Sequence, residues 1–96
     1  MLLSAIVTVC SLMGTGEKTC DVRVLMVYDA PSMKQCNKET QETAHKVSQD
    51  SLKANKGSII LVSNGDCMKI DEMKDAVNAA PEAMAREGYT YKLTLY

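Results

Sequence analysis

The chain has 96 residues, which is enough for one domain with a single core and little spare stability. Hydrophobic residues make up 46% and charged residues 24%, proportions typical of a folded rather than a disordered chain. Eleven basic and twelve acidic side chains give a formal net charge of -1, so the chain lacks the basic field that nucleic-acid binding usually requires. Residues 1–96 are therefore predicted to form a single α/β domain with no nucleic-acid partner.

The N-terminal segment MLLSAIVTVCSLMG is apolar but has no Lys or Arg before its apolar run and no small-x-small cleavage site after it. It is also shorter than the roughly 20 residues needed to cross a bilayer, so no membrane partner is expected. The β-branched run from Ile6 to Val9 favours a strand over about residues 4–12. A secretion signal is the competing interpretation of the same segment.

The next feature is GTGEKT at residues 14–19, which resembles the end of a phosphate-binding loop and the linker between zinc-finger modules. A phosphate loop would have Gly directly before Lys and a helix afterwards, but here Glu17 intervenes and a strand-like run follows. The paired Cys and His residues of a zinc finger are missing as well. We therefore predict a hairpin turn centred on Thr15, which places Cys10 directly opposite Cys20.

Further strands are predicted at about 21–28, at 58–63 and at 89–96. A first helix is expected to start at Ser32, where Ser32 and Gln35 form a capping-box pattern, and to end at Gly57 with a thin apolar stripe. A second helix, with a better apolar stripe, is expected after Lys69, with a break before Pro81.

The predicted order is β-β-α-β-α-β, which gives a small α/β fold with a four-stranded mixed sheet. If both helical crossovers step in the same direction, the helices lie mainly on one face of the sheet. Strand 58–63 contains Ile59-Ile60-Leu61-Val62, which is apolar on both faces, so something must cover the second face. The candidates are the N-terminal strand, a second subunit or another protein.

Four cysteines allow three pairings. The hairpin register favours a Cys10–Cys20 disulfide. Cys36 and Cys67 then remain, and a disulfide between them is sterically plausible if strands two and three are neighbours. Bridged cysteines would indicate an exported protein, and free buried thiols a cytoplasmic one; both remain open from the sequence. His45 is half a helical revolution and about 13 Å from Cys36, so the two cannot share a metal and no metal site is predicted.

The loops after strands two and three contain the weak ligand-binding candidates Asp29, Ser32, Asn64 and Asp66. All four residue types also serve ordinary turns and caps, and no glycine-rich phosphate motif accompanies them. No cofactor is predicted, and no nucleophile–His–carboxylate set is suggested by the spacing, so no catalytic residue is assigned.

The function expected from these features is a small non-enzymatic protein–protein interaction module with an accessory, inhibitory or structural role. Its surfaces would be the apolar sheet face and the acidic start of the second helix, Asp71, Glu72 and Asp75, and its partner another protein or a second copy in a homo-oligomer. One alternative is a thiol-redox or small-ligand-binding enzyme at the Cys36/Cys67 rim. The other is an exported domain stapled by disulfides.

Overall fold

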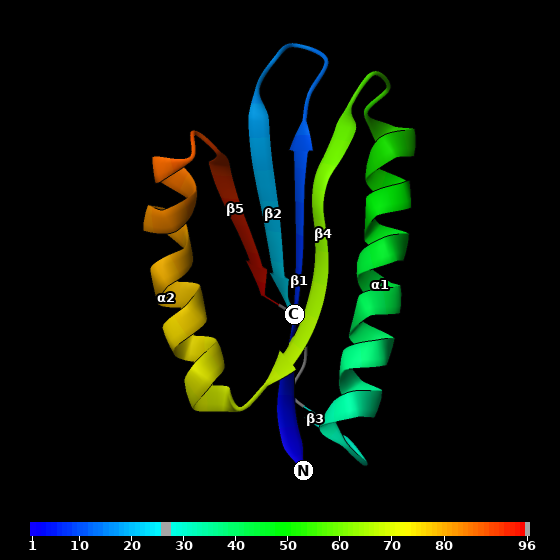
Figure 1. The fold of residues 1–96 in the computed structure, drawn as a ribbon, viewed down its shortest axis with the longest axis vertical. Helices are drawn as coiled ribbons and strands as arrows, with labels where there is room; N and C mark the ends of the chain where they lie inside the picture. Colours follow the sequence, from blue (N-terminus) through cyan, green and yellow to red (C-terminus); the bar gives the residue numbers. More distant parts are fainter. Residues whose placement is uncertain (26–27, 96) are drawn as a thin grey trace.

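The structure is a computed structural model that describes residues 1–25 and 28–95. Its elements are β1 (Leu2–Leu12), β2 (Lys18–Val24), β3 (Tyr28–Asp29), α1 (Met33–Ala54), β4 (Ile59–Met68), α2 (Ile70–Arg86) and β5 (Thr90–Leu95) (Figure 1). The predicted four-stranded mixed sheet in the order β-β-α-β-α-β is confirmed, with the two-residue β3 in addition. Residues 26–27 of the predicted second strand and residue 96 of the predicted last strand lie outside the described residues.

The strand β1 lies at the centre of the sheet. It pairs antiparallel with β2 and with β4, and β5 pairs parallel with β2, which gives the order β4-β1-β2-β5. Its first residues also pair with β3. The second and third predicted strands are therefore separated by β1 and are not neighbours, and β4 runs beyond the predicted 58–63 to Met68. Pairing with β1 keeps residues 64–67 extended although Asn, Gly and Asp favour turns.

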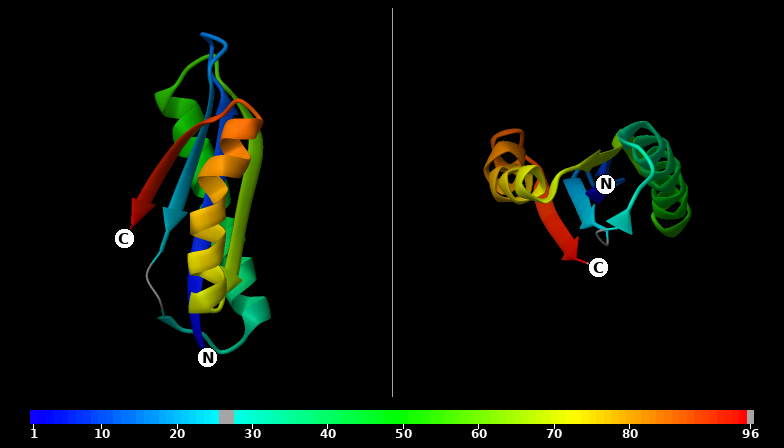
Figure 2. Two further views of the ribbon diagram at one scale, coloured as in Figure 1. Left: turned by 90° about the vertical axis from the view of Figure 1, so that its left-hand side faces the viewer. Right: turned by 90° about the horizontal axis from the view of Figure 1, so that it is seen from below.

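The two helices cover opposite faces of the sheet, as the view from below shows (Figure 2). Val7 and Val9 of β1 pack with Ala44 of α1, whereas their neighbour Ile6 packs with Val77 of α2. Adjacent residues of a strand point to opposite faces, so these contacts define an α1 face and an α2 face. The expectation that the helices lie mainly on one face does not match this arrangement. It required crossovers that step in the same direction, but the β2-to-β4 crossover and the β4-to-β5 crossover step in opposite directions.

The turn between β1 and β2 has the predicted register. Cys10 is paired with Cys20 and their Sγ atoms lie 2.02 Å apart, in one of the two predicted disulfides. The turn closes with the Gly16 N–H donating to the Met13 carbonyl at 2.9 Å, and Gly16 has a φ of 90° that other residues rarely adopt. The hairpin tip therefore spans residues 13–17, centred on Thr15 as the sequence indicates, and residues 18–19 already belong to β2.

The helix ends agree with the sequence in part. The Ser32 hydroxyl accepts from the Gln35 N–H at 3.1 Å, which confirms the predicted cap of α1. Pro81, in contrast, lies inside α2, which is continuous from Ile70 to Arg86, so the predicted break at this residue is wrong. A proline removes only one helical hydrogen bond, and the packing of Val77 and Met84 on the same sheet cluster holds the two halves together.

The helix α1 is fastened to β4 by a covalent bond and by a row of small side chains. The Cys36–Cys67 disulfide joins the first turn of α1 to the end of β4, with the Sγ atoms 1.96 Å apart. Gly65 lies so close to α1 that a Cβ atom there would be 2.2 Å from the Thr40 carbonyl oxygen. The buried residues of α1 recur every four positions and are all small: Cys36, Thr40, Ala44 and Ser48.

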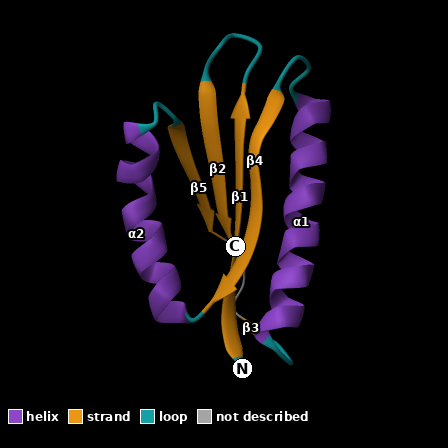
Figure 3. Ribbon diagram, viewed as in Figure 1, coloured by secondary structure: helices purple, strands orange, loops and turns teal. Residues whose placement is uncertain are grey.

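Side chains of α1 also occupy the outer edge of β4. The Cys67 N–H donates to Asn37 Oδ1 at 2.8 Å, and the Gly65 N–H donates to Gln41 Oε1 at 3.0 Å. Edge strands otherwise present unpaired backbone groups to other chains, so these two side chains block that edge over its second half. The helix and strand lie side by side over their whole lengths (Figure 3).

Candidate functional site

The first half of β4 exposes apolar side chains. Ile59, Leu61 and Val62 are 59%, 45% and 40% exposed, respectively. Ile59 and Val62 pair with Leu12 and Cys10 of β1. Leu12 and Cys10 lie an even number of residues from Ile6, so they and their partners point to the same face as Ile6, the α2 face. Leu61 is the extra residue of an irregularity in the register opposite Cys10 and Ser11, which turns it outwards.

A groove of about 210 Å³ runs along the α2 face between β4 and α2. Ile6 and Val22 are part of its floor, and Val77 and Met84 of α2 are part of one wall. Methionine side chains adapt their shape readily, so a groove with Met68 and Met84 in its walls can accept apolar groups of different shapes. Together with Ile59 and Val62 we call this groove the α2-side surface.

One acidic residue, Asp66, lines the α2-side surface, and three more lie at the start of the neighbouring helix α2. Asp71, Glu72 and Asp75 are all exposed in the first turns of α2, where acidic side chains also complement the helix dipole. Asp66 lines the groove itself, and its Oδ2 accepts from Asn64 Nδ2 at 2.7 Å. A ligand with basic groups therefore matches this surface better than an acidic one.

The four weak ligand-binding candidates do not come together. Asn64 and Asp66 lie side by side in the groove of the α2 face, because both belong to β4 and not to a loop. Ser32 caps α1, and Asp29 forms an ion pair with the N-terminal amine of Met1. The structure thus gives Ser32 and Asp29 structural roles and places only the other pair in a groove.

The Cys36/Cys67 rim is closed. Cys36 is 0% exposed and Cys67 is 7% exposed, and the Thr40 hydroxyl lies 3.0 Å from Cys67 Sγ. A thiol enzyme needs an accessible thiolate, whereas both sulfur atoms here belong to one buried disulfide.

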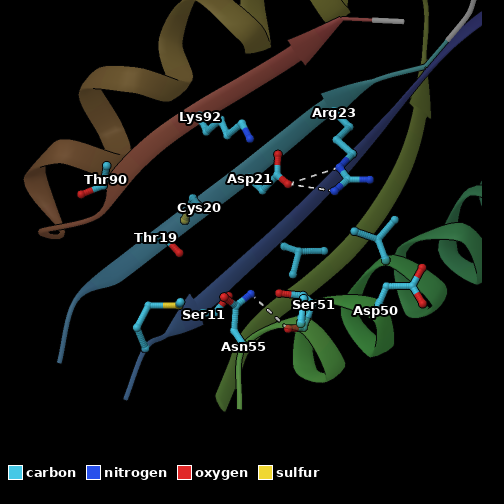
Figure 4. Close-up of a pocket in the computed structure, with 14 residues that line it drawn as sticks. Ser11, Thr19, Cys20, Asp21, Arg23, Asp50, Ser51, Asn55, Thr90 and Lys92 are labelled. Atoms are coloured by element: carbon cyan, nitrogen blue, oxygen red, sulfur yellow. Dashed lines mark hydrogen bonds and ion pairs between the residues drawn. The ribbon is translucent and has the colours of Figure 1, made fainter. Parts of the chain in front are cut away.

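A second groove of about 490 Å³ lies on the α1 face. It was not predicted from the sequence. Its floor is formed by β1, β2 and β5, and α1 forms one wall. Figure 4 shows Asp21, Arg23 and Lys92 on the two strands, with Asp50, Ser51 and Asn55 on the helix. The alternation of polar and apolar residues in both strands was a signal for it, since Asp21 and Arg23 alternate with buried Val22 and Val24.

His45 lies on the exposed side of α1, where its Nε2 is 3.1 Å from Gln49 Nε2. Within residues 1–25 and 28–95, no group of three or more His, Cys, Asp or Glu side chains is placed so that it could hold a metal ion. Neither α1 nor α2 combines the length and the apolar character that a bilayer-spanning helix needs.

Comparison with known proteins returns no matching family model, no matching curated protein and no matching solved structure.

Proposed function

We propose that the protein is a non-enzymatic interaction module that binds another protein, or a second copy of itself, through the α2-side surface. The observation that carries the proposal is the exposure of Ile59 and Val62 beside an apolar groove. Large apolar side chains grouped at the surface of a domain mark interaction sites more often than isolated ones do. These two residues are grouped with Leu61 on one strand, next to a groove with methionine walls.

The chemistry of the surface defines the kind of partner segment. An apolar floor with acidic residues at one end suits a segment that has apolar side chains in the groove and Lys or Arg at its end. The charge pattern of this chain also permits self-association, because residues 34–56 hold five Lys against three acidic residues. The groove residues supply the contact area, and the charges at Asp71, Glu72 and Asp75 select the orientation.

The test compares affinity capture by three forms of the protein from its source organism. Val62→Lys places a charge on the α2-side surface, and Leu52→Lys places the same charge at an exposed leucine of α1. Proteins that bind wild type and Leu52→Lys but not Val62→Lys are the expected result. If the same proteins are retained by all three forms, the α2-side surface is not the interaction site.

Light scattering of the purified chain separates the two kinds of partner. A mass that rises with concentration for wild type and Leu52→Lys but stays monomeric for Val62→Lys assigns self-association to this surface. A wild-type mass that stays at one chain, together with specific capture of another protein, assigns a foreign partner.

A second candidate, the exported domain stapled by disulfides, is favoured by the two cysteine pairs. Disulfides persist in oxidising compartments and add about 2–4 kcal/mol each to a small domain. This candidate concerns the compartment and is compatible with an interaction role. Alkylation of the native protein tests it: no cysteine should react before reduction, and all four should react after reduction in denaturant.

A further inference from the structure

The groove on the α1 face holds a buried polar atom that lacks a partner in the described chain. Asp21 Oδ1 is buried and has no hydrogen-bond partner, although Asp21 Oδ2 accepts from Arg23 Nε and Nη2 at 3.2 and 3.1 Å. Ser11, which lines the same groove, is only 4% exposed. A buried polar atom without a partner costs about 1–3 kcal/mol, so Asp21 Oδ1 marks this groove as a place where a ligand could supply a donor.

The pairing of strands places these groups next to a cation. Lys92 of β5 is the register partner of Asp21, and Val9 of β1 is its partner on the other side. Directly paired residues point to the same face, so the lysine, the aspartate and the valine form one row across the groove floor. Lys92 makes no ion pair with any residue of the described chain.

The wall opposite Lys92 carries an acid and apolar side chains. Asp50 of α1 lines the groove and has no ion-pair partner among the described residues. Val47, one turn earlier on α1, packs against Val9 of the floor. The groove thus combines an unpaired cation, unpaired acidic oxygens and an apolar corner within about 490 Å³, a volume typical of small-molecule sites.

We propose that this groove binds a small zwitterion that carries an ammonium and a carboxylate group, namely an α-amino acid or a short peptide with an apolar side chain. The ligand carboxylate pairs with Lys92 and the outer side of Arg23. Its ammonium group donates to Asp21 Oδ1 and to Asp50, and its side chain rests on Val9 and Val47. A simple anion would leave the acidic oxygens unpaired, and a simple cation would leave Lys92 unpaired, so only a ligand with both charges satisfies the groove.

The test is an amide NMR titration of the full chain, with its disulfides intact, against three matched probes. L-leucine carries both charges, L-leucine amide lacks the carboxylate, and N-acetyl-L-leucine lacks the ammonium. L-leucine is expected to shift the amide signals of Asp21, Lys92 and Ser51, and each of the other probes to bind about tenfold more weakly, since each loses one charged contact. Equal binding of the three probes, or no shift in the groove at millimolar L-leucine, overturns the proposal.

Two variants link each charge of the ligand to one residue. Lys92→Gln should weaken L-leucine about tenfold and leave L-leucine amide unchanged, and Asp21→Asn should weaken L-leucine and leave N-acetyl-L-leucine unchanged. The control is Lys74→Gln on the exposed side of α2, which should leave every affinity unchanged. Lys92 is exposed, so its substitution leaves the fold intact, and an unaltered L-leucine affinity in Lys92→Gln contradicts the assignment.

The dipeptide L-leucyl-L-leucine distinguishes the two sources of such a ligand. It carries the same charges one residue further apart. Tighter binding than L-leucine assigns the groove to short peptides, and weaker binding assigns it to free amino acids.

Discussion

The two helices of this protein differ in how they are held to the sheet. The helix α1 has four buried residues, a side-chain cap at Ser32, a disulfide at Cys36 and side-chain hydrogen bonds to the edge of β4. The helix α2 has no buried residue and no side-chain cap, and it contains a proline. Yet α2 has the more amphipathic sequence, with Met73, Val77 and Met84 on one side.

The difference shows that close packing here depends on small size and polar satisfaction more than on an apolar stripe. Thr40 and Ser48 of α1 can be buried because their hydroxyls donate to the carbonyls of Cys36 and Ala44 at 2.8 and 2.9 Å. The row of small buried side chains on α1 lets its backbone approach Gly65 directly. The larger side chains of α2 keep it further from the sheet and leave the groove beside it open. The tightly held face is therefore expected to control stability, and the loosely held face to be available for binding.

The largest effect is expected from Gly65→Ala, which breaks the close approach of α1 to β4. The new Cβ would lie 2.2 Å from the Thr40 carbonyl oxygen, a backbone atom that cannot move alone. We expect a loss of more than about 3 kcal/mol in the free energy of unfolding, measured by chemical denaturation. The control is Gly14→Ala, where the new Cβ meets its nearest atom at 3.7 Å and little change is expected. Similar losses in both variants would show that the α1–β4 contact is not specially tight.

Removal of the Cys36–Cys67 disulfide is the next largest test. The double variant Cys36→Ala with Cys67→Ala should lose about 2–4 kcal/mol of unfolding free energy. The matched control removes Cys10 and Cys20 instead. The two bridges close separations of 31 and 10 residues, so loop-closure entropy alone makes the first loss larger by about 1 kcal/mol. A larger loss of unfolding free energy in the variant without Cys10 and Cys20 would show that the hairpin, and not the α1–β4 contact, depends more on its disulfide.

A smaller effect is expected from Asn37→Ala, which removes the acceptor of the Cys67 N–H at the edge of β4. Leaving this donor without a partner should cost about 1–2 kcal/mol and should speed hydrogen exchange at the Cys67 amide. Gln49→Ala is the control, because Gln49 is exposed and its side chain hydrogen-bonds with exposed His45 rather than with β4 in the described chain. If exchange at the Cys67 amide is equally fast in both variants, the Asn37 side chain does not protect the edge.

The smallest effect concerns the α2 face, where Tyr91 packs against the same cluster as Met84. Its hydroxyl is buried without a partner in the described chain, so Tyr91→Phe should leave stability unchanged or raise it by up to about 1 kcal/mol. Burial raises the pKa of Tyr91 above 10.0, which means that the folded state keeps this proton after the unfolded state has lost it. The wild type should therefore lose stability as the pH rises above about 10, whereas Tyr91→Phe should lose less.

Thermal unfolding of both proteins between pH 8 and pH 11 measures that difference, at intervals of about one unit around the ordinary tyrosine pKa. A parallel decline of the two curves would show that the Tyr91 hydroxyl is hydrated in the folded protein.

The candidate sites were only partly visible in the sequence. The exposed apolar run at Ile59 and Val62 and the acidic start of α2 are local patterns, and both are exposed in the structure. The alternating pattern of β2 and β5 does not locate the groove on the α1 face, because Asp21 and Lys92 are far apart in the chain and meet only through the parallel pairing of these strands. Nothing in the sequence indicates that Ser11 is buried beside this groove, because its burial depends on its position in the central strand.

The sequence by itself determined the features that depend on neighbouring residues. The turn centred on Thr15, the Cys10–Cys20 pair, the Ser32 cap and the order of strands and helices follow from short-range spacing and backbone preference. Only the tertiary structure decided that β1 lies between β2 and β4, that Pro81 stays within α2, and that the helices cover opposite faces. These outcomes depend on the direction of each crossover and on contacts between distant segments, which no local pattern encodes.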